Sequence, residues 1–574
     1  MWNRAARAPA GLKLLAWEAQ LAHHPDRERV EWLLQGLRLG FMLGIDPDRL
    51  AESGPSDHVV LGPDGLPANN SSAERDPGVL STWVAEETGG GRVIGGFQDI
   101  PRFGRGVSTF VHPLGLAPKS VPWGDLPKWR STADLSRAKV NDLIRDETAR
   151  VLYPSIPGIA RRWASKQGWW AVVFDVEAAF RNLPIHPSQY RFATFYWDGT
   201  YYVDTRLNFG GRTGPVLYDQ FGEMLLWILS RELTARGLEH VAERLLDDNA
   251  ILVRTEREAW MVFSLVQEVC SALGVRLAPK KLQSPTQTPI FLGFVWDLIR
   301  GVLGLTADKL RKLDGRLQAW DKPVGSRFTL KDLQSLLGYL EHAAMVLAPA
   351  RAFMRRLQDA ARVGGPAFAA VYLSTAMVSD LAFWRELRAR QACHWLPLPR
   401  VRHRHEAQDV EGMDLQEVTA YTDASEGGMG GHWGPRFFAA VWPQGSLQAT
   451  SITYLEAYAV LTAVRLWGPQ MRGRMWRILS DNRGVVDDFR RQRSPSCPLI
   501  QGIIREVALL SIEFGFELVL DWIPTHHNPI ADALSRQSVH RLHPAQAAWL
   551  RLREAVPATW TSTDSLMQRA WTRL

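Results

Sequence analysis

The sequence predicts a multidomain protein of the mixed α/β and α+β classes. Its 574 residues would make about three to four domains, and 46% of them are hydrophobic, which is ample for several buried cores. Strand-like apolar runs alternate with amphipathic helical runs over residues 93–300 and again over 416–536. Residues 306–392, between these two regions, follow an almost wholly helical pattern.

The composition favours an intracellular protein that binds a polyanion. The net charge is +7, and the 24 tryptophans can pack in cores or stack on bases. Cys270, Cys393 and Cys497 are far apart and have no CxxC spacing, which argues against a disulfide framework or a zinc knuckle. We find no signal peptide and no apolar run of about 18 residues, so we expect an intracellular protein without a membrane span.

The N-terminal region begins with a predicted helix. In "PDRERVEWLLQGLRLGFMLG" Asp26 can cap the helix. Residues 45–78 are rich in Pro, Gly, Asp, Asn and Ser, which indicates a linker or a mobile loop. The apolar stripe of the helix consists of Val30, Leu33, Leu34, Leu37 and Phe41.

The strands and helices that follow are read from their hydrophobic periods. "WWAVVFDV", "TYYVDTRL" and "PIFLGFVWDL" are strand-like, and "VLYDQFGEMLLWILSRELTARG" is a long amphipathic helix. "TLKDLQSLLGYLEHAAMVLAPARAFMRRL" is the clearest helical stretch of the next region, and the charged "RVRHRHEAQDVEGMD" marks a boundary after it. We divide the chain into residues 1–78, 79–300, 301–410, 416–540 and a tail of 541–574.

Two adjacent acids interrupt the apolar run "RLLDDNAILV". Asp247 and Asp248 fit a tight turn in a hairpin, because Asp-Asp-Asn has good turn chemistry and would leave both acids in water. They also fit a metal site together with Asp175, which ends the strand "WWAVVFD". Three converging carboxylates repel one another and need divalent cations to be tolerated.

The order of the motifs favours the metal site. "FDVEAAFRNLPIHP", "LNFGGRTGPVLYDQF", "LLDDNAILV", "LGVRLAPKKLQSP" and "FLGFVWD" resemble motifs A to E of reverse transcriptases, and "GLAPKSVPWGDLPKWRSTADLSRAKVND" is similar to their fingers. The likeness covers about residues 26–540 and is strongest to the DIRS group of retrotransposons, related to gypsy-type elements. It implies a right-hand polymerase with fingers, palm and thumb, followed by a helical connection.

The resemblance also implies a role for each matching residue. Asp175, Asp247 and Asp248 would bind two Mg²⁺ ions, with Mn²⁺ as a possible substitute, assisted by the carbonyl of Val176. Phe180 would exclude a 2′-hydroxyl and so select deoxynucleotides. The remaining nucleotide-binding residues would be Lys119 and Arg130 on the triphosphate, Gly210 at a close backbone approach, and Lys280 at the leaving pyrophosphate.

Three positions depart from this pattern or leave it open. Leu245 stands where the family usually has a tyrosine, and "NFGGRTGP" replaces the commoner "LPFG" wording. We expect altered nucleotide or primer packing there rather than inactivity. Lys281, next to Lys280, is an alternative for the motif D lysine.

A second set of acids follows the helical region. Asp423 ends a strand in "AYTDASEGGMGGHW", Glu456 lies in the helix "TYLEAYAVLTAVRLWG", and Asp481 ends the strand "MWRILSDN". Asp532 falls in the first turn of a helix that Asn528 can cap and Pro529 can start. The order resembles the D-E-D-D set of ribonuclease H, which implies two more Mg²⁺ ions and cleavage of the RNA strand of a hybrid. His526 and His527 are read as loop residues, with a catalytic role as the alternative.

Together these features predict an RNA-directed DNA polymerase with ribonuclease H. Its partners would be an RNA template, a DNA primer, their hybrid and deoxynucleotides, with no membrane partner. The alternatives are a polymerase of another template class and a domesticated or inactive nucleic-acid-binding protein derived from a retroelement. The tail after residue 540 reads as helical and carries no motif of its own.

Overall fold

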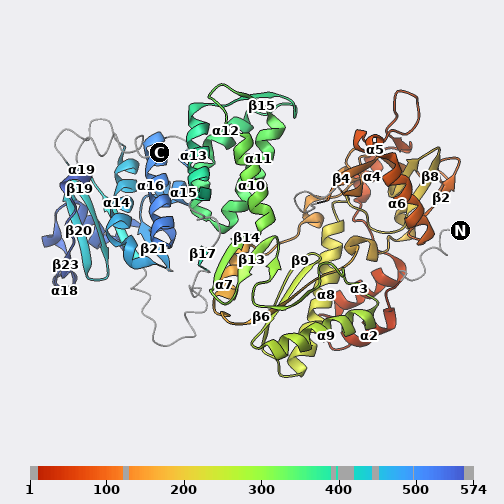
Figure 1. Ribbon diagram of the computed structural model, residues 1–574, viewed down its shortest axis with the longest axis horizontal. Helices are drawn as coiled ribbons and strands as arrows, with labels where there is room; N and C mark the ends of the chain where they lie inside the picture. The colour runs from red at the N-terminus through yellow and green to blue at the C-terminus, as the bar shows by residue number, and fades with distance from the viewer. Residues whose placement is uncertain are drawn as a thin grey trace. The chain divides into compact units, whose positions relative to one another are not determined.

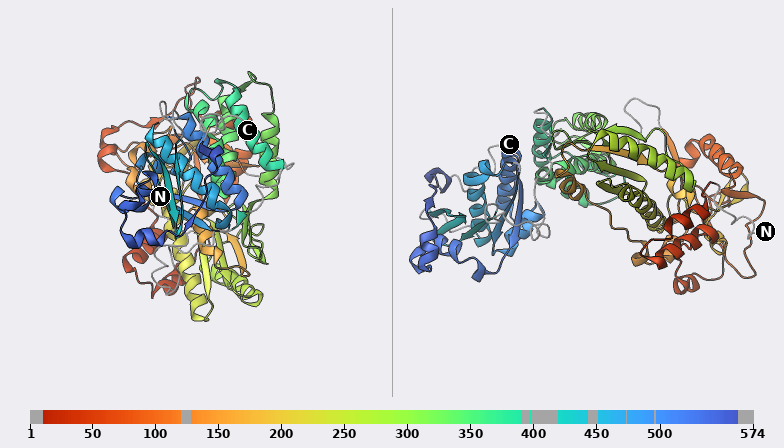
Figure 2. Two further views of the ribbon diagram at one scale, coloured as in Figure 1. Left: turned by 90° about the vertical axis from the view of Figure 1, so that its left-hand side faces the viewer. Right: turned by 90° about the horizontal axis from the view of Figure 1, so that it is seen from below.

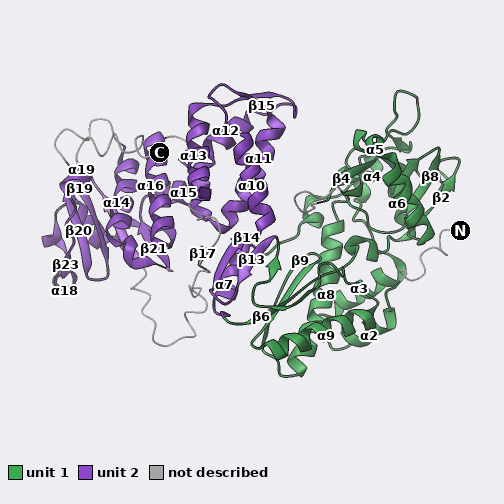
Figure 3. Ribbon diagram, in the orientation of Figure 1, with its two compact units in different colours: residues 1–154, 168–292 green, residues 155–167, 293–574 purple. Residues whose placement is uncertain are grey.

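The computed structural model describes residues 11–119, 128–389, 396–397, 419–442, 451–472, 474–494 and 497–561 (Figure 1). The chain forms two compact units (Figure 3). The first comprises residues 1–154 and 168–292, and the second comprises 155–167 and 293–574. Both units combine helices with sheets, so the predicted mixed α/β multidomain class is confirmed. No helix among the described residues is both long and apolar enough to cross a bilayer.

The N-terminal helix forms as predicted. Helix α3, Arg27–Leu39, follows Asp26, whose carboxylate accepts a hydrogen bond from the backbone N–H of Arg29 at 3.0 Å. The predicted apolar stripe is buried, and its last member, Phe41, lies beyond the helix in a bridge to Ile185. Helix α2, Leu14–Leu21, contacts α3 and packs into the same core.

Residues 45–78 are not a linker, and this prediction was wrong. The segment contains α4, Pro47–Glu52, the strand β1, His58–Val59, and α5, Ser71–Arg75. Asp46 caps α4 and forms an ion pair with Arg145. The many turn residues separate these short elements, and β1 joins a sheet by pairing in parallel with β3, Phe110–His112. Pairing over such a distance in sequence leaves no local periodicity.

The first unit contains two small sheets built from residues 58–204. The larger has the strand order β1-β3-β7-β8-β2 and the smaller is the antiparallel pair β4-β5. Helix α6, Pro77–Gly89, packs beside β2. The remaining strands here are β2 Val93–Phe97, β4 Leu114–Pro118, β5 Trp129–Ala133, β7 Thr194–Trp197 and β8 Thr200–Asp204.

A four-stranded antiparallel sheet forms the centre of the first unit. Its order is β11-β6-β10-β9, and helices α8 and α9 pack against it and against each other; Figure 2 shows them from two further sides. The predicted long helix is confirmed as α8. The bounds are β6 Trp170–Asp175, α8 Gly214–Ala235, β9 His240–Leu245, β10 Asp248–Val253, α9 Glu256–Leu273 and β11 Gln283–Thr286.

The second unit begins with a small sheet and a helical bundle. The predicted strand "PIFLGFVWDL" is split, because Leu292 and Gly293 both have positive φ angles, of 54° and 78°. The helical prediction for the next region is confirmed through Ala389, interrupted by the strand pair β15-β16. The bounds are α7 Ile156–Ala164, β12 Ile290–Phe291, β13 Phe294–Asp297, β14 Val302–Leu305, α10 Ala307–Ala319, β15 Arg327–Thr329, α11 Leu330–Val346, α12 Arg355–Arg362, β16 Ala370–Tyr372, α13 Thr375–Ala389 and β17 Leu396–Pro397.

The rest of the second unit is built on a six-stranded sheet. Its order is β22-β21-β18-β19-β20-β23, and α14 lies against β18 and β19 while contacting α16. The tail is not wholly helical, since β23 pairs in parallel with β20. The bounds are β18 Thr419–Ala424, β19 Gly428–Trp433, β20 Arg436–Val441, α14 Ile452–Trp467, β21 Met475–Ser480, α15 Arg483–Arg490, α16 Pro498–Phe514, β22 Glu517–Trp522, α17 Pro529–Ser535, α18 Pro544–Trp549, β23 Leu552–Arg553 and α19 Ala558–Thr561.

Two candidate metal-binding active sites

The acid pair Asp247 and Asp248 lies at the turn of a hairpin. Strands β9 and β10 pair antiparallel, with Leu245 opposite Asp248, and the turn consists of Leu246 and Asp247. Leu246 has a φ of +54°, which an L-residue adopts only at a cost. The backbone carbonyl of Asp247 accepts hydrogen bonds from the N–H of Val176 at 3.3 Å and from the side chain of Asn249 at 2.7 Å. The turn therefore presents two carboxylates beside the end of β6.

Strand pairing brings the third predicted acid to this turn. Asp175 and Asp248 are register partners in the β6–β10 ladder, so their side chains leave the sheet at the same end. Asp175 is only 4% exposed, and burial raises its pKa to about 7, with further repulsion from Asp247 and Asp248. Burial likewise raises the pKa of Asp248. Asp247 and Asp248 therefore belong both to the hairpin turn and to the cluster of acids that includes Asp175.

A lysine neutralises part of this charge, and it is Lys281. Its ammonium forms an ion pair with Asp175 and lies 3.9 Å from an oxygen of Asp248. The segment that carries it is tied to the end of β6, because the N–H of Ala278 donates to the carbonyl of Asp175 at 2.8 Å. Lys280, the predicted residue, is exposed at the neighbouring position. In the sequence, the only indication of Lys281 was its position next to Lys280.

Two of the residues predicted to hold the nucleotide, Phe180 and Arg130, meet at one aromatic cluster. The Phe180 ring lies 5.0 Å from that of Phe209 and 5.7 Å from that of the buried Tyr218. The guanidinium of Arg130 stands 4.3 Å above the Phe209 ring. Lys119 is exposed at the end of β4, where its backbone N–H donates to the carbonyl of Lys128 at 2.7 Å. Phe209 therefore joins Arg130 to Phe180, a link that the sequence did not indicate.

Gly210 is required by a close approach within the chain itself. Its φ is +133°, and a Cβ added there would lie 1.9 Å from the carbonyl oxygen of Ala133. The N–H of Ala133 donates to the carbonyl of Phe209, and Asn141 donates to the carbonyl of Gly210 at 3.0 Å. The loop after β8 is thereby held against β5, which carries Arg130.

Three acids of the second set converge. Ligand oxygens of Asp423, Glu456 and Asp481 all lie within 4.8 Å of one another. Asp423 is near the end of β18, Asp481 directly follows β21, and Glu456 lies in α14. The parallel pairing of β18 with β21 places the first two at the same edge of the sheet. Among the described residues, no other group of three metal-ligating side chains is this compact.

The electrostatics of this triad fit a bound cation. Burial and repulsion by Asp423 and Asp481 raise the pKa of Glu456 to about 9, and burial raises that of Asp423 to about 7. Oε2 of Glu456 is buried and makes no hydrogen bond within the described chain. Ser535, which the sequence did not single out, donates to Asp423. A divalent cation would neutralise the charge and give the orphaned oxygen a partner.

Asp532 lies near the triad but outside that compact group. It belongs to α17, contributes to the raised pKa of Asp423 and Glu456, and accepts a hydrogen bond from Arg536 at 2.7 Å. Pro529 begins α17 as predicted, but Asn528 does not cap it. Instead the Asn528 amide donates to the carbonyl of Thr422 at 3.0 Å, which ties α17 to the strand of Asp423.

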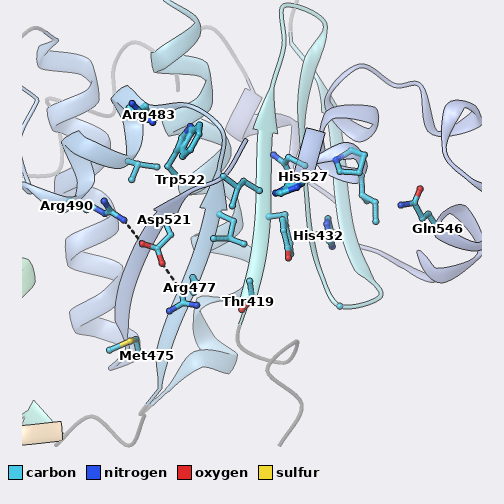
Figure 4. Close-up of a pocket in the computed structure, with 18 of the residues that line it drawn as sticks. Thr419, His432, Met475, Arg477, Arg483, Arg490, Asp521, Trp522, His527 and Gln546 are labelled. Atoms are coloured by element: carbon cyan, nitrogen blue, oxygen red, sulfur yellow. Dashed lines mark hydrogen bonds and ion pairs between the residues drawn. The ribbon is translucent and has the colours of Figure 1, made fainter. Parts of the chain in front are cut away.

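An open trough of about 1140 Å³ lies on the six-stranded sheet and is lined by residues of β18, β21, β22 and α15 (Figure 4). Arg477 and Arg490 both form ion pairs with Asp521, and the Arg483 guanidinium lies 4.5 Å from the centre of the Trp522 ring. The Trp522 indole donates to the backbone carbonyl of Asp481 at 2.9 Å. His527 lines the trough, and His526 and His527 are both exposed in a 3-10 turn, as expected of loop residues.

Comparison with known proteins identifies part of the chain. Residues 125–296 match the family model described as reverse transcriptase (RNA-dependent DNA polymerase). This segment contains Asp175, Asp247 and Asp248, so the first acid cluster lies within a reverse transcriptase domain. No curated protein matches the chain.

Several solved structures are similar over most of the chain. The protease-reverse transcriptase dRH of a foamy virus, in complex with double-stranded DNA, is 17% identical with a TM-score of 0.42, and the match covers 89% of this chain and 82% of that one. A second foamy viral complex with double-stranded DNA is 15% identical with a TM-score of 0.42, covering 90% and 98%. A third, with an RNA/DNA hybrid, is 15% identical with a TM-score of 0.38, covering 92% and 86%.

Proposed function

We propose that this protein is an RNA-directed DNA polymerase with ribonuclease H activity, encoded by a retroelement most similar to the DIRS group. The observation that carries the proposal is the presence of two separate acid clusters in one chain. The first lies inside the reverse transcriptase domain, and the second joins Asp423, Glu456 and Asp481. A polymerase that copies RNA leaves a hybrid, and a hybrid-specific nuclease removes the template from it.

At the first site, Asp175, Asp247 and Asp248 would hold Mg²⁺ or Mn²⁺. The ions would activate the primer 3′-hydroxyl and stabilise the leaving pyrophosphate. Lys281 is placed to balance the carboxylates and to donate a proton near them. Arg130 and Lys119 are exposed cations at the β4–β5 pair, where they would bind the triphosphate.

The Phe180 ring would form the wall beneath the sugar of the incoming nucleotide. Its contacts with Phe209 and Tyr218 hold it in one orientation, so that a 2′-hydroxyl would clash with it. We infer from this wall that the substrates are deoxynucleotides and the product is DNA. The template, primer and hybrid would bind mainly through their phosphates, so binding should weaken as salt rises.

At the second site, Asp423, Glu456, Asp481 and Asp532 would hold a further pair of ions. Those ions would supply the hydroxide that attacks the RNA phosphodiester. Ser535 orients Asp423 by its hydrogen bond, and Arg536 restrains Asp532. An intracellular location, predicted from the sequence, is consistent with substrates of RNA and deoxynucleotides.

Separate inactivation of the two sites tests this proposal. Primer extension on poly(rA)/oligo(dT) with Mg²⁺ measures the first activity, and release of labelled RNA from a preformed hybrid measures the second. We expect Asp247→Asn to abolish extension and leave hybrid cleavage intact. We expect Asp481→Asn to do the reverse, because the two acids belong to different clusters.

A matched control is the exposed Asp142, which lies in the reverse transcriptase domain away from both acid clusters. Asp142→Asn should retain both activities. If the wild-type protein bound hybrid but showed neither activity, it would be an inactive nucleic-acid-binding protein. If Asp247→Asn and Asp481→Asn both retained both activities, the site assignment would be wrong.

A further inference from the structure

Arg181 directly follows Phe180, yet its side chain points into the protein and is only 7% exposed. Its backbone is part of a short 3-10 helix, Ala179–Asn182, which begins after Ala178 in a left-handed conformation with φ of 51°. Burying a guanidinium costs several kcal/mol unless every donor is satisfied. Burying Arg181 is therefore energetically demanding, and it occurs directly beside Phe180, whose ring is predicted to lie beneath the sugar.

Two carboxylates on different elements hold the guanidinium. Nε and Nη2 donate to Glu87 of α6, and Nη1 donates to both oxygens of Asp204 of β8, at 2.8 and 2.7 Å. Arg92 forms a second ion pair with Glu87 at 2.8 Å, so two cations face two anions. The planar guanidinium forms these paired contacts because its donors are arranged in a fixed fork.

Arg181 also reaches the loop that carries Phe209. Its Nη1 donates to the backbone carbonyls of Arg206 and Leu207, each at 3.3 Å. Leu207 is two residues before Phe209, and Arg181 itself is one residue after Phe180. A single buried side chain thus holds together the two loops whose aromatic rings lie 5.0 Å apart at an angle of 51°.

We propose that Arg181 is a positioning residue that sets the discrimination between deoxyribonucleotides and ribonucleotides. It does so by fixing the Phe180 and Phe209 rings relative to each other, so that the Phe180 ring cannot move away from a 2′-hydroxyl. Lysine at this position would keep the charge but lose the fork, and it could not bond both carboxylates and both carbonyls at once. The inference rests on the proposed polymerase function and adds the residue that fixes its sugar specificity.

The experiment is single-nucleotide extension with dATP and with ATP, comparing kcat/KM for the two. We expect Arg181→Lys to reduce the preference for dATP by about tenfold, equivalent to about 1.4 kcal/mol, mainly by improving use of ATP. Phe180→Ala should reduce the preference further. Adding Arg181→Lys to Phe180→Ala should then change nothing more, because the lysine acts through that ring.

Arg92→Lys is the matched control. Arg92 shares Glu87 with Arg181, but among the described contacts its side chain makes no bond to the carbonyls of Arg206 or Leu207. It should leave the dATP-to-ATP ratio unchanged. Thermal unfolding of each variant separates this effect from a loss of fold. Asp204→Asn keeps an acceptor for Arg181 and should reduce the preference for dATP over ATP by less than Arg181→Lys does.

An unchanged ratio in Arg181→Lys, with extension from dATP intact, would overturn the inference and leave the polymerase proposal standing. Additive effects of the lysine and alanine substitutions would also overturn it, because Arg181 would then act independently of Phe180. A wild-type protein that extends no primer would remove the polymerase proposal itself.

Discussion

Glu456 has the most strongly raised pKa among the acids of the second site. Its pKa is raised from 4.5 to about 9 by burial first and by Asp423 and Asp481 next. Between those two pH values the folded protein retains a proton that the unfolded chain has released. The free energy of unfolding must therefore fall as pH rises across this interval when no metal is bound.

We expect Glu456→Gln to remove that part of the pH dependence. In a chelator, the Tm of the wild-type protein should drop more steeply from about pH 5 to pH 9 than the Tm of the variant, because glutamine has no proton to lose. Mg²⁺ should raise the wild-type Tm most at high pH and do little for the variant. The exposed Glu513, replaced by glutamine, serves as the control and should follow the wild type. Identical pH slopes for wild type and Glu456→Gln would contradict the assignment.

Lys281 is a second residue whose contacts lead to a testable prediction. Both lysines are exposed, but the ammonium of Lys281 forms an ion pair with Asp175 and lies 3.9 Å from Asp248, contacts that Lys280 does not make among the described residues. We expect Lys281→Met to lower kcat for primer extension by about a hundredfold, the scale of a lost proton donor, and Lys280→Met to have a much smaller effect. Steady-state extension at saturating dNTP measures both. The reverse order would restore Lys280 to the role that the motif suggested.

At the scale of elements, the loop Asn208–Gly211 is shaped by its contact with β5. Gly210→Ala would drive a Cβ to 1.9 Å from the carbonyl of Ala133 in a left-handed conformation, so loop and strand must separate. We expect a loss of about 1–3 kcal/mol in unfolding free energy together with weakened extension. Urea unfolding and primer extension measure the two effects.

Gly211→Ala provides the comparison within the same loop. Its Cβ would meet only side-chain atoms, Cδ1 of Leu135 at 3.3 Å and Oδ1 of Asn208 at 3.7 Å, and its φ is not in the left-handed region. This variant should stay close to wild type in both measurements. Equal behaviour of the two alanine variants would mean that the contact with Ala133 does not hold the loop.

At the scale of the whole molecule, a buried ion pair joins the helical bundle of the second unit to the part that contains the six-stranded sheet. Arg505 of α16 pairs with Asp380 of α13, which is fully buried, and also donates to the carbonyl of Ala352 at 3.3 Å. Arg356 adds a second contact to Asp380. Without Arg505, Arg356 would be the one remaining cation in contact with the buried Asp380 among the described residues, and a buried carboxylate that loses its main partner is strongly destabilising.

We expect Arg505→Met to lower the free energy of unfolding of this unit by about 3–5 kcal/mol. The exposed pair between Arg491 and Asp487 is the control, since these side chains are 65% and 46% exposed, and Arg491→Met should cost less than about 1 kcal/mol because solvent screens the pair. Chemical denaturation followed by tryptophan fluorescence measures both. A small change in Arg505→Met would show that apolar packing of α16, rather than this charge pair, joins the two regions.

Much of the fold followed from periodicity and cap chemistry. Helix α3 with its Asp26 cap, the long α8 and the hairpin at Asp247 are all local patterns, so the sequence predicted them. The segment 45–78 and the strand β23 were missed because their pairing partners lie far away along the chain. Asn528 was predicted as a cap from local spacing, but a distant carbonyl competes for its amide.

The sequence by itself determined which acids the protein places at strand ends and turns, because those positions follow from the order of apolar runs and turn residues. Only the tertiary structure decided which of them meet and at what electrostatic cost. Pairing of β6 with β10, and of β18 with β21, brings together side chains separated by dozens of residues. The same long-range contacts selected Lys281 over Lys280 and buried Arg181 between two loops, since burial and neighbouring charge depend on elements that no local pattern contains.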